Sequence, residues 1–275
     1  MKKIILSLLL ALPAGAMAQE ADKSVLEVRY RVDYRNNMND STLHNDDFAL
    51  WIGERQSKYF SMRTKRNQEV RDSLQKEGYD SHQMLDALRS GAIPRSGQPY
   101  VVMKNWPKEG KMLFLDNVFS DCYGCEDEMY PFDWQLVEGD TVVAGYQCQK
   151  AQTTWHGRTW TVWYALDLPY DNGPWKLGGL PGLILSARDA AGDYAMEAQA
   201  ILKGKGDAIG YANKYEKCTQ KDYQSLKRKM AEDPTALLKQ RYGNQVKIVS
   251  IDSTGKRTEG WIGNTPVFFE IFDKK

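Results

Sequence analysis

The sequence predicts a mainly β fold of the α+β type, with a large curved antiparallel sheet or half-barrel and two helical insertions covering one side. Two observations support this class. Apolar and polar residues alternate over many short segments, which is typical of strands with one wet face. Short turn signals join most of these segments, and this disfavours a parallel βαβ array because parallel strands need long crossover connections.

The strand pattern begins at 24–35, where apolar residues alternate with charged ones from Val28 to Tyr34. The polar run 36–47 indicates a loop. Tight turns are expected at His156-Gly157 and at 191–193. The further expected strands are 48–55, 57–63, 99–105, 111–119, 132–139, 140–155, 158–168, 184–190, 194–202, 246–252 and 267–273.

Helical spacing of apolar residues appears in two places. One or two helices are expected in 64–90, where Gly78 separates two sets of residues spaced a turn apart. Another is expected in 218–242, interrupted near Pro234 because proline breaks the backbone hydrogen-bond ladder.

The first eighteen residues have the three-part pattern of a secretory signal. Lys2 and Lys3 precede a short apolar run, and small residues lead to an expected cleavage between Ala18 and Gln19. The sequence therefore predicts a signal peptide at 1–18 and a single β-rich domain at 19–275. Gln19, and not a cysteine, stands directly after the cleavage point, so lipid attachment there is not expected, and no later stretch is long and apolar enough to span a bilayer. We expect a protein of the periplasm, or a secreted or cell-surface protein.

The charge balance gives no case for a nucleic-acid partner, since the formal net charge is only +1 and the two signs are interspersed. Motifs for a catalytic serine, a zinc protease or a phosphate-binding loop are not present in the sequence. The three histidines lie far apart and lack partners at metal-ligand spacing. These observations favour a binding protein over an enzyme, and we expect neither a metal nor another cofactor.

The cysteines leave three interpretations open. Cys122 and Cys125 stand in a Cys-Tyr-Gly-Cys motif, and in an oxidising compartment such close cysteines most often form a local disulfide. Acidic neighbours disfavour a reactive thiol, because negative charge raises the thiol pKa. A copper or zinc site or a thiol-redox site centred on this pair are the alternatives. Four cysteines allow three pairings, and the sequence does not choose among them.

The stretch 169–182 is too rich in proline and glycine for regular structure. It either packs as an irregular plug in the core or borders a cleft lined by aromatic rings, which concave binding sites commonly use. The candidate ligand-binding residues of such a cleft are Trp163, Tyr164, Tyr170 and Trp175. The stretch ends in a six-residue motif formed by Gly179, Leu180, Pro181, Gly182, Leu183 and Ile184.

This motif reads GLPGLI, and the segment 145–189 closely resembles the GLPGLI family of exported proteins from Bacteroidetes-type bacteria. The agreement includes Trp163-Tyr164, Pro169 and Gly173-Pro174. The resemblance implies an envelope protein and no particular reaction. The Cys122–Cys125 motif is not part of the family pattern, which makes it a local elaboration.

Three functions are consistent with these observations. The favoured one is a non-enzymatic binding or accessory protein that holds a small apolar or peptide ligand, or contacts an outer-membrane protein, in a half-barrel similar to that of periplasmic lipoprotein carriers. The second is thiol-redox or metal handling at Cys122 and Cys125. The third is a purely structural or assembly role in which the motif is a packing device.

Overall fold

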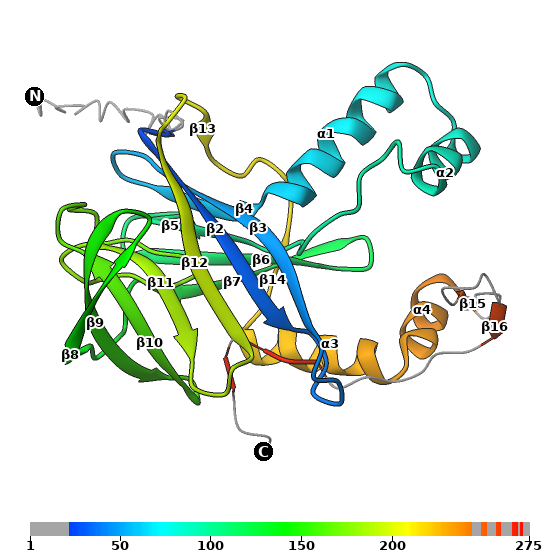
Figure 1. Ribbon diagram of the computed structural model, residues 1–275. Helices are drawn as coiled ribbons and strands as arrows, with labels where there is room; N and C mark the ends of the chain where they lie inside the picture. Colours follow the sequence, from blue (N-terminus) through cyan, green and yellow to red (C-terminus); the bar gives the residue numbers. More distant parts are fainter. Residues whose placement is uncertain (1–21, 244–248, 252–256, 260–265, 269, 272–275) are drawn as a thin grey trace, which may run out of the picture.

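The computed structural model describes residues 22–243, 249–251, 257–259, 266–268 and 270–271. The expected signal peptide and its cleavage point at Ala18 and Gln19 lie outside the described residues. Within them, the chain folds around one large, curved, twelve-stranded sheet whose two edge strands do not pair (Figure 1). The expected fold class, mainly β with helices beside a large open sheet, is confirmed.

Two meanders make up the sheet. The first contains β2 (Leu26–Arg35), β3 (Leu43–Ile52), β4 (Ser57–Ser61), β5 (Val101–Lys104), β6 (Lys111–Val118) and β7 (Asp121–Glu128). The second contains β8 (Gln135–Val143), β9 (Tyr146–Trp155), β10 (Arg158–Ala165), β11 (Leu183–Asp189) and β12 (Tyr194–Lys203). They join where β12 pairs antiparallel with β2, so the first and last long strands lie at the middle of the sheet.

Several short elements complete the described part of the chain. β14 (Glu216–Lys217) pairs parallel with β7 at one edge of the sheet, while β8 forms the other edge. β1 (Asp22–Lys23) pairs with β13 (Ala208–Ile209), and β15 (Val249–Ile251) pairs with β16 (Arg257–Glu259).

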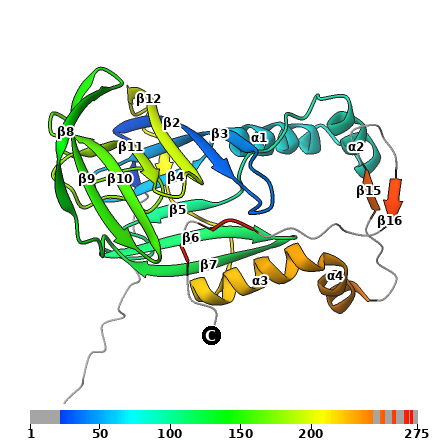
Figure 2. The ribbon, with the colours of Figure 1, turned by 60° about the horizontal axis from the view of Figure 1, so that its bottom comes forward.

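The helices fall where the apolar spacing predicts them. α1 (Met62–Lys76) and α2 (Ser81–Arg89) occupy the first region, and Asp80 begins α2 through a capping box with Gln83. α3 (Gln220–Glu232) and α4 (Pro234–Tyr242) occupy the second. Their boundary lies at Asp233, since Pro234 can start a helix but cannot continue one. α3 packs beside β6 and β7, whereas α1 extends away from the end of β4 (Figures 1 and 2).

Some expected boundaries are wrong. The β8–β9 turn lies at Ala144-Gly145, where φ is 49° and 86°, a conformation that suits a tight hairpin. The position where we expected the two strands to meet, Gly139, is instead a bulge inside β8. β7 was not expected, because acidic residues on both faces hide its alternation. The described part of the expected strand 267–273 is not a strand, although Pro266 bridges Asn37.

The sheet has a buried inner face and an outer face that is buried only in part. Its inner face gathers residues from both meanders into one core, for example Tyr30 and Phe48 with Trp160 and Ile184. The hydroxyl of Tyr30 donates to the Ile184 carbonyl over 2.7 Å and so links the two meanders. A smaller cluster around Trp51 and Met103 covers part of the outer face.

The proline- and glycine-rich segment between β10 and β11 plugs the inner core. Trp175, Leu177 and Leu180 are almost fully buried in it. Lys104, from β5 in the other meander, is also buried, and its Nζ donates to Asn172 Oδ1, the Gly173 carbonyl and the Leu177 carbonyl at 2.8, 2.9 and 2.6 Å. Three acceptors match the three protons of an ammonium, although burial lowers the pKa of Lys104 well below its ordinary value. The segment between β10 and β11 therefore packs as an irregular plug in the core, one of the two arrangements that the sequence allowed.

Candidate binding cavity

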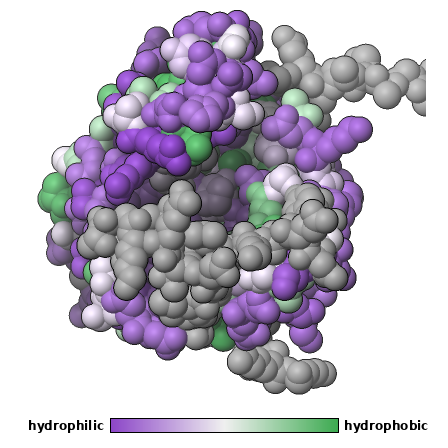
Figure 3. Space-filling view, turned by 90° about the vertical axis from the view of Figure 1, so that its right-hand side faces the viewer, coloured by the Kyte–Doolittle hydropathy of each residue, from purple (hydrophilic) through white to green (hydrophobic). Residues whose placement is uncertain are grey.

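A cavity of about 170 Å³ lies on the inner face of the sheet, beneath α3 and beside residues 266–268 and 270. The face of the molecule that bears α2 and α4 is hollowed, with hydrophilic residues on the α1–α2 side of the hollow (Figure 3). The described lining residues are Val32, Tyr34, Arg35, Asn36, Gln98, Tyr100, Phe114, Asp116, Trp175, Lys176, Tyr194, Gln220, Tyr223, Gln224, Lys227, Pro266, Val267, Phe268 and Glu270.

A row of aromatic rings forms one side of the cavity, and Tyr100, Phe114 and Tyr223 of this row line it. The ring centroids are 5.1 Å apart for Phe48 and Tyr100, 5.7 Å for Tyr100 and Phe114, and 5.4 Å for Phe114 and Tyr223. The row runs from β3 through Tyr100, which directly precedes β5, and then through β6 to α3, so it joins the sheet to the helix that covers it. Such ring pairs contribute about 0.5–1.5 kcal/mol each beyond their buried area, which favours a rigid wall.

The opposite wall comes from the second meander and the motif segment. The Trp160 ring, fully buried, lies 5.6 Å from Trp175 and 6.3 Å from Tyr194, and the latter two border the cavity. Burial raises the pKa of Tyr194 well above its ordinary value, so its hydroxyl stays neutral. Both walls therefore present uncharged ring surfaces.

Lys176 closes the floor of the cavity as a buried cation. Its Nζ lies 2.5 Å from both Asp127 Oδ2 and Glu270 Oε1, and 5.5 Å from the centre of the Phe114 ring. Burial alone would disfavour the ammonium, but the two carboxylates outweigh it and raise the pKa of Lys176. The ion pair also fixes Glu270, which forms part of the wall together with residues 266–268.

A second ion pair lies at the α3 side. Asp116, almost fully buried on β6, accepts hydrogen bonds from the Tyr223 hydroxyl and, over 3.1 Å, from Lys227 Nζ. Burial and the neighbouring carboxylate raise the pKa of Tyr223 well above its ordinary value, so the phenol remains a donor. The carboxylate of Asp116 therefore already has two donors of its own.

Arg158 links residues 266–268 to the sheet. Its guanidinium is buried, pairs with Asp189 and with Asp193 Oδ2 (2.9 Å), and lies 5.0 Å from the centre of the Tyr194 ring. Its Nε donates to the Phe268 carbonyl over 2.6 Å. Phe268 and Val267 are thus held against the cavity from β10.

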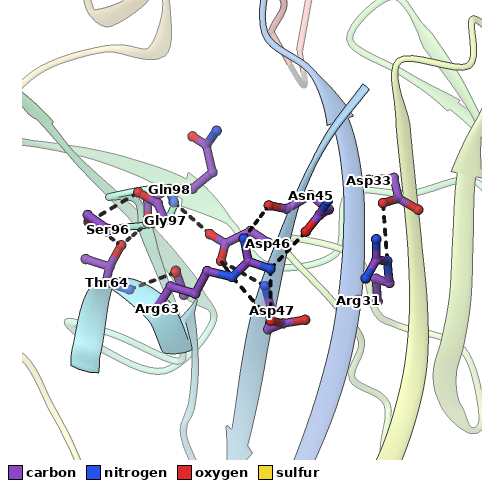
Figure 4. Close-up of polar contacts among 11 residues, drawn as sticks. Arg31, Asp33, Asn45, Asp46, Asp47, Arg63, Thr64, Ser96, Gly97 and Gln98 are labelled. Atoms are coloured by element: carbon purple, nitrogen blue, oxygen red, sulfur yellow. Dashed lines mark hydrogen bonds and ion pairs between the residues drawn. The ribbon is translucent and has the colours of Figure 1, made fainter. Parts of the chain in front are cut away.

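A polar network holds the rim of the cavity. Buried Asp46 on β3 accepts from the Gln98 backbone N–H over 2.7 Å (Figure 4). Arg63, at the start of α1, donates to the Asn45 carbonyl over 2.9 Å and pairs with Asp47 at 3.2 Å. Burial raises the pKa of Asp46, although the Gln98 N–H and the nearby Arg63 guanidinium act to lower it. The network fixes the backbone of Gln98 and leaves its side chain at the cavity.

Two buried donors at the cavity lack hydrogen-bond partners among the described residues. They are Arg35 Nε and Gln220 Nε2. The guanidinium of Arg35 faces Asp193 through Nη1, at 3.3 Å, so Nε is left over. A buried donor without a partner costs free energy, and an acceptor on a bound molecule would remove that cost.

The four aromatic residues expected to line one cleft do not come together. Trp175 borders the cavity, but Tyr164 is 1% exposed inside the core, where its hydroxyl donates to Gln149 Oε1 over 2.9 Å. Trp163 lies on the opposite face of β10 from Tyr164, because side chains alternate along a strand. The Lys150 ammonium lies over the Trp163 ring. Tyr170 borders a separate depression beside Lys104.

The expected Cys122–Cys125 disulfide is contradicted. Both residues lie in β7, three positions apart, so their side chains point to opposite faces of the sheet. Cys122 packs in the outer cluster, where its Sγ is 3.0 Å from the Tyr211 hydroxyl, while Cys125 is buried in the inner core. The same geometry removes the basis for a dithiol site made of these two residues. No group of three potential metal ligands occurs among the described residues.

Most cavity residues were missed from the sequence. Tyr34, Tyr100, Tyr194 and Tyr223 come from four separate segments and look like ordinary half-buried strand or helix residues. The available signal was the excess of tyrosine and tryptophan, 15 and 8 residues, which pointed to aromatic surfaces without placing them.

No protein-family model matches the chain, and no curated protein sequence matches it. Two crystal forms of PNGF-II align with 74% and 73% of this chain at 16% and 15% identity, with TM-scores of 0.47 and 0.48. This chain spans about a third of the PNGF-II chain (33% and 32%).

A LolA superfamily protein from Nitrosomonas europaea aligns with 71% of this chain and 89% of its own, at 8% identity and a TM-score of 0.26. In the described part of the chain, no helix is long and apolar enough to cross a membrane.

Proposed function

We propose that the protein is a non-catalytic binding protein that holds a small amphipathic molecule in the inner cavity. The observation that carries this proposal is a cavity with aromatic walls and two buried donors that lack partners among the described residues. The apolar body of the ligand lies against Tyr100, Tyr194 and Trp175. An acceptor group at its other end meets Arg35 or Gln220.

The size of the cavity limits the ligand. A cavity of about 150 Å³ with apolar walls can hold a benzene molecule. The 170 Å³ found here therefore suits one ring or a short acyl chain rather than a long lipid or a folded peptide. A peptide ligand would therefore place only a single side chain or one terminus in the cavity.

The charges at the cavity favour an acceptor or an anion over a cation. The carboxylates of Asp116 and Glu270 are already paired with Lys227 and Lys176. The unfilled hydrogen-bonding capacity belongs to N–H groups, on Arg35 and Gln220. A carboxylate would satisfy such donors, whereas an ammonium would add a buried charge without an acceptor.

Titration with three six-carbon probes tests the proposal. Hexanoate is expected to bind more tightly than 1-hexanol, and hexylammonium more weakly than either, by calorimetry or protein-observed NMR. For such small molecules we expect a hexanoate Kd on the order of 0.1–1 mM. Absence of binding by all three probes would favour the structural or assembly role.

A matched pair of variants places the binding in the cavity. Gln98→Trp fills the cavity with an indole while keeping the backbone N–H that Asp46 holds, and is expected to weaken hexanoate binding at least about tenfold. Gln199→Trp adds the same ring at an exposed position of β12 and is expected to change nothing. Equal losses in both variants contradict the assignment.

We also propose that the protein is exported to the cell envelope as a GLPGLI-type protein. The support is the leader pattern of 1–18 and the motif at Gly179–Ile184. N-terminal sequencing of the protein from the envelope fraction is expected to begin at Gln19. A chain that retains Met1 would contradict the export signal.

A further inference from the structure

The N-terminus of α3 meets β7 at a pair of cysteines. β14 runs parallel to β7, with Glu216 opposite Tyr123 and Lys217 opposite Gly124. The next pair in this register is Cys218 and Cys125. The Cys218 backbone N–H donates to the Gly124 carbonyl over 3.0 Å, which continues the pairing to the cysteine itself.

The two sulfur atoms are neighbours. Cys125 Sγ and Cys218 Sγ are 3.1 Å apart, whereas a disulfide bond is about 2.05 Å long, so closure needs a shift of about 1 Å. The other cysteines have different surroundings. Cys122 faces Tyr211 on the outer face of the sheet, and buried Cys148 lies on β9 near the Tyr146 carbonyl.

We propose that Cys125 and Cys218 form a disulfide that fastens the start of α3 to the edge of the sheet. Cys218 directly precedes Thr219, whose side chain caps α3. The next residues of α3 include Tyr223 and Lys227, which line the cavity. The bond therefore holds one wall of the cavity in place.

The reaction is thiol–disulfide exchange with a small disulfide oxidant such as oxidised glutathione. Cys218, the more exposed of the two, attacks as a thiolate, forms a mixed disulfide and releases one glutathione thiol. The Cys125 thiol then loses its proton and attacks the Cys218 sulfur, releasing the second glutathione thiol. Two protein thiols are oxidised and one glutathione disulfide is reduced. A hydrogen bond with Cys125 lowers the pKa of Cys218, which suits it to the first step.

Thiol counting on the full chain tests the bond. The reduced protein is treated with oxidised glutathione, denatured, alkylated and digested. Before alkylation, we expect the intact chain to have a mass about 2 Da below that of the reduced chain, because disulfide formation removes two hydrogen atoms. After alkylation and digestion, we expect two alkylated cysteines, Cys122 and Cys148, and a crosslinked peptide pair that joins Cys125 to Cys218. Four alkylated cysteines, or a crosslink that includes Cys122 or Cys148, overturns the proposal.

Variants and hydrogen exchange separate the bond from its role. After the same oxidation, Cys218→Ser is expected to show three free thiols and Cys122→Ser one. Amide exchange in 219–227 is expected to be slower in the oxidised chain than in the reduced chain, while exchange in α1 stays the same. Equal exchange in 219–227 overturns the role in holding the cavity wall, whatever the thiol count.

Discussion

Replacement of Lys176 by methionine is expected to lower the free energy of unfolding by about 3–5 kcal/mol at neutral pH. The substitution leaves Asp127 and buried Glu270 without their cation, and an unpaired buried charge is strongly destabilising. Urea unfolding followed by tryptophan fluorescence measures the change. The same variant is expected to bind hexanoate more weakly, since Glu270 belongs to the segment that borders the cavity.

An exposed lysine–glutamate pair between β14 and β7 is the matched control. Lys217 lies 2.8 Å from Glu126, and its side chain is 73% exposed, so Lys217→Met is expected to leave the stability almost unchanged. Both lysines pair with carboxylates, so the expected difference in stability loss between the two variants comes from burial. Similar losses in the two variants would contradict the assignment of Lys176 as a buried ionic support.

The raised pKa of Lys176 determines how the stability difference between the wild type and the Lys176→Met variant depends on pH. Because the folded-state pKa lies above the unfolded value, the stabilisation is fully present below the ordinary lysine pKa, about 10.4. It is lost as the pH rises through the folded pKa. The stability gap between the wild type and the methionine variant is therefore expected to shrink at strongly alkaline pH, and a gap that grows there contradicts the account.

Replacement of Gly182 by alanine is expected to destabilise the protein by about 3 kcal/mol, at the upper end of the range for overpacking. A Cβ at this position would lie 2.2 Å from the Ala165 carbonyl oxygen, which belongs to the backbone of β10 and cannot rotate away. Thermal and urea unfolding measure the effect. The motif glycine is thus explained by close approach of two backbones.

Gly210 is the matched control position for Gly182. A Cβ there would meet nothing within 4 Å, and its φ lies outside the left-handed region, so Gly210→Ala is expected to be neutral or slightly stabilising. If both alanine variants behaved alike, the packing explanation of Gly182 would be wrong.

Local patterns predicted much of the fold. The alternation from Val28 to Val32 marks the inner face of β2, and Pro234 marks the break between α3 and α4. The turn at His156-Gly157 also lies where expected, with φ of 42° and 72°. These signals succeeded because each depends on a few neighbouring residues.

The candidate site could not be predicted in the same way. Its walls combine β2, β6, β12, α3, the residues just before β5 and the described residues 266–268 and 270, so their meeting depends on the order of strands in the sheet. Lys104 and Lys176 read as ordinary surface lysines, yet both are fully buried. Their roles depend on carbonyls and carboxylates that lie far away in the sequence.

The prediction of a Cys122–Cys125 disulfide was wrong for a simpler reason. The spacing of Cys122 and Cys125 favours a disulfide in a loop and forbids one in a strand, and β7 was not recognised as a strand. Glu126 and Glu128 are exposed while Asp127 faces Lys176, so the acidic run hides an ordinary alternation. Sequence spacing alone therefore could not identify Cys218 as the neighbour of Cys125.

The most direct test of the binding cavity is an NMR measurement of contacts between bound hexanoate and the protein. We expect nuclear Overhauser effects from the hexanoate methylene protons to the ring protons of Tyr100 and Tyr194, and their loss in Gln98→Trp. Contacts with exposed residues such as Leu136 and Val142 on β8, and none with the two tyrosines, would contradict the account.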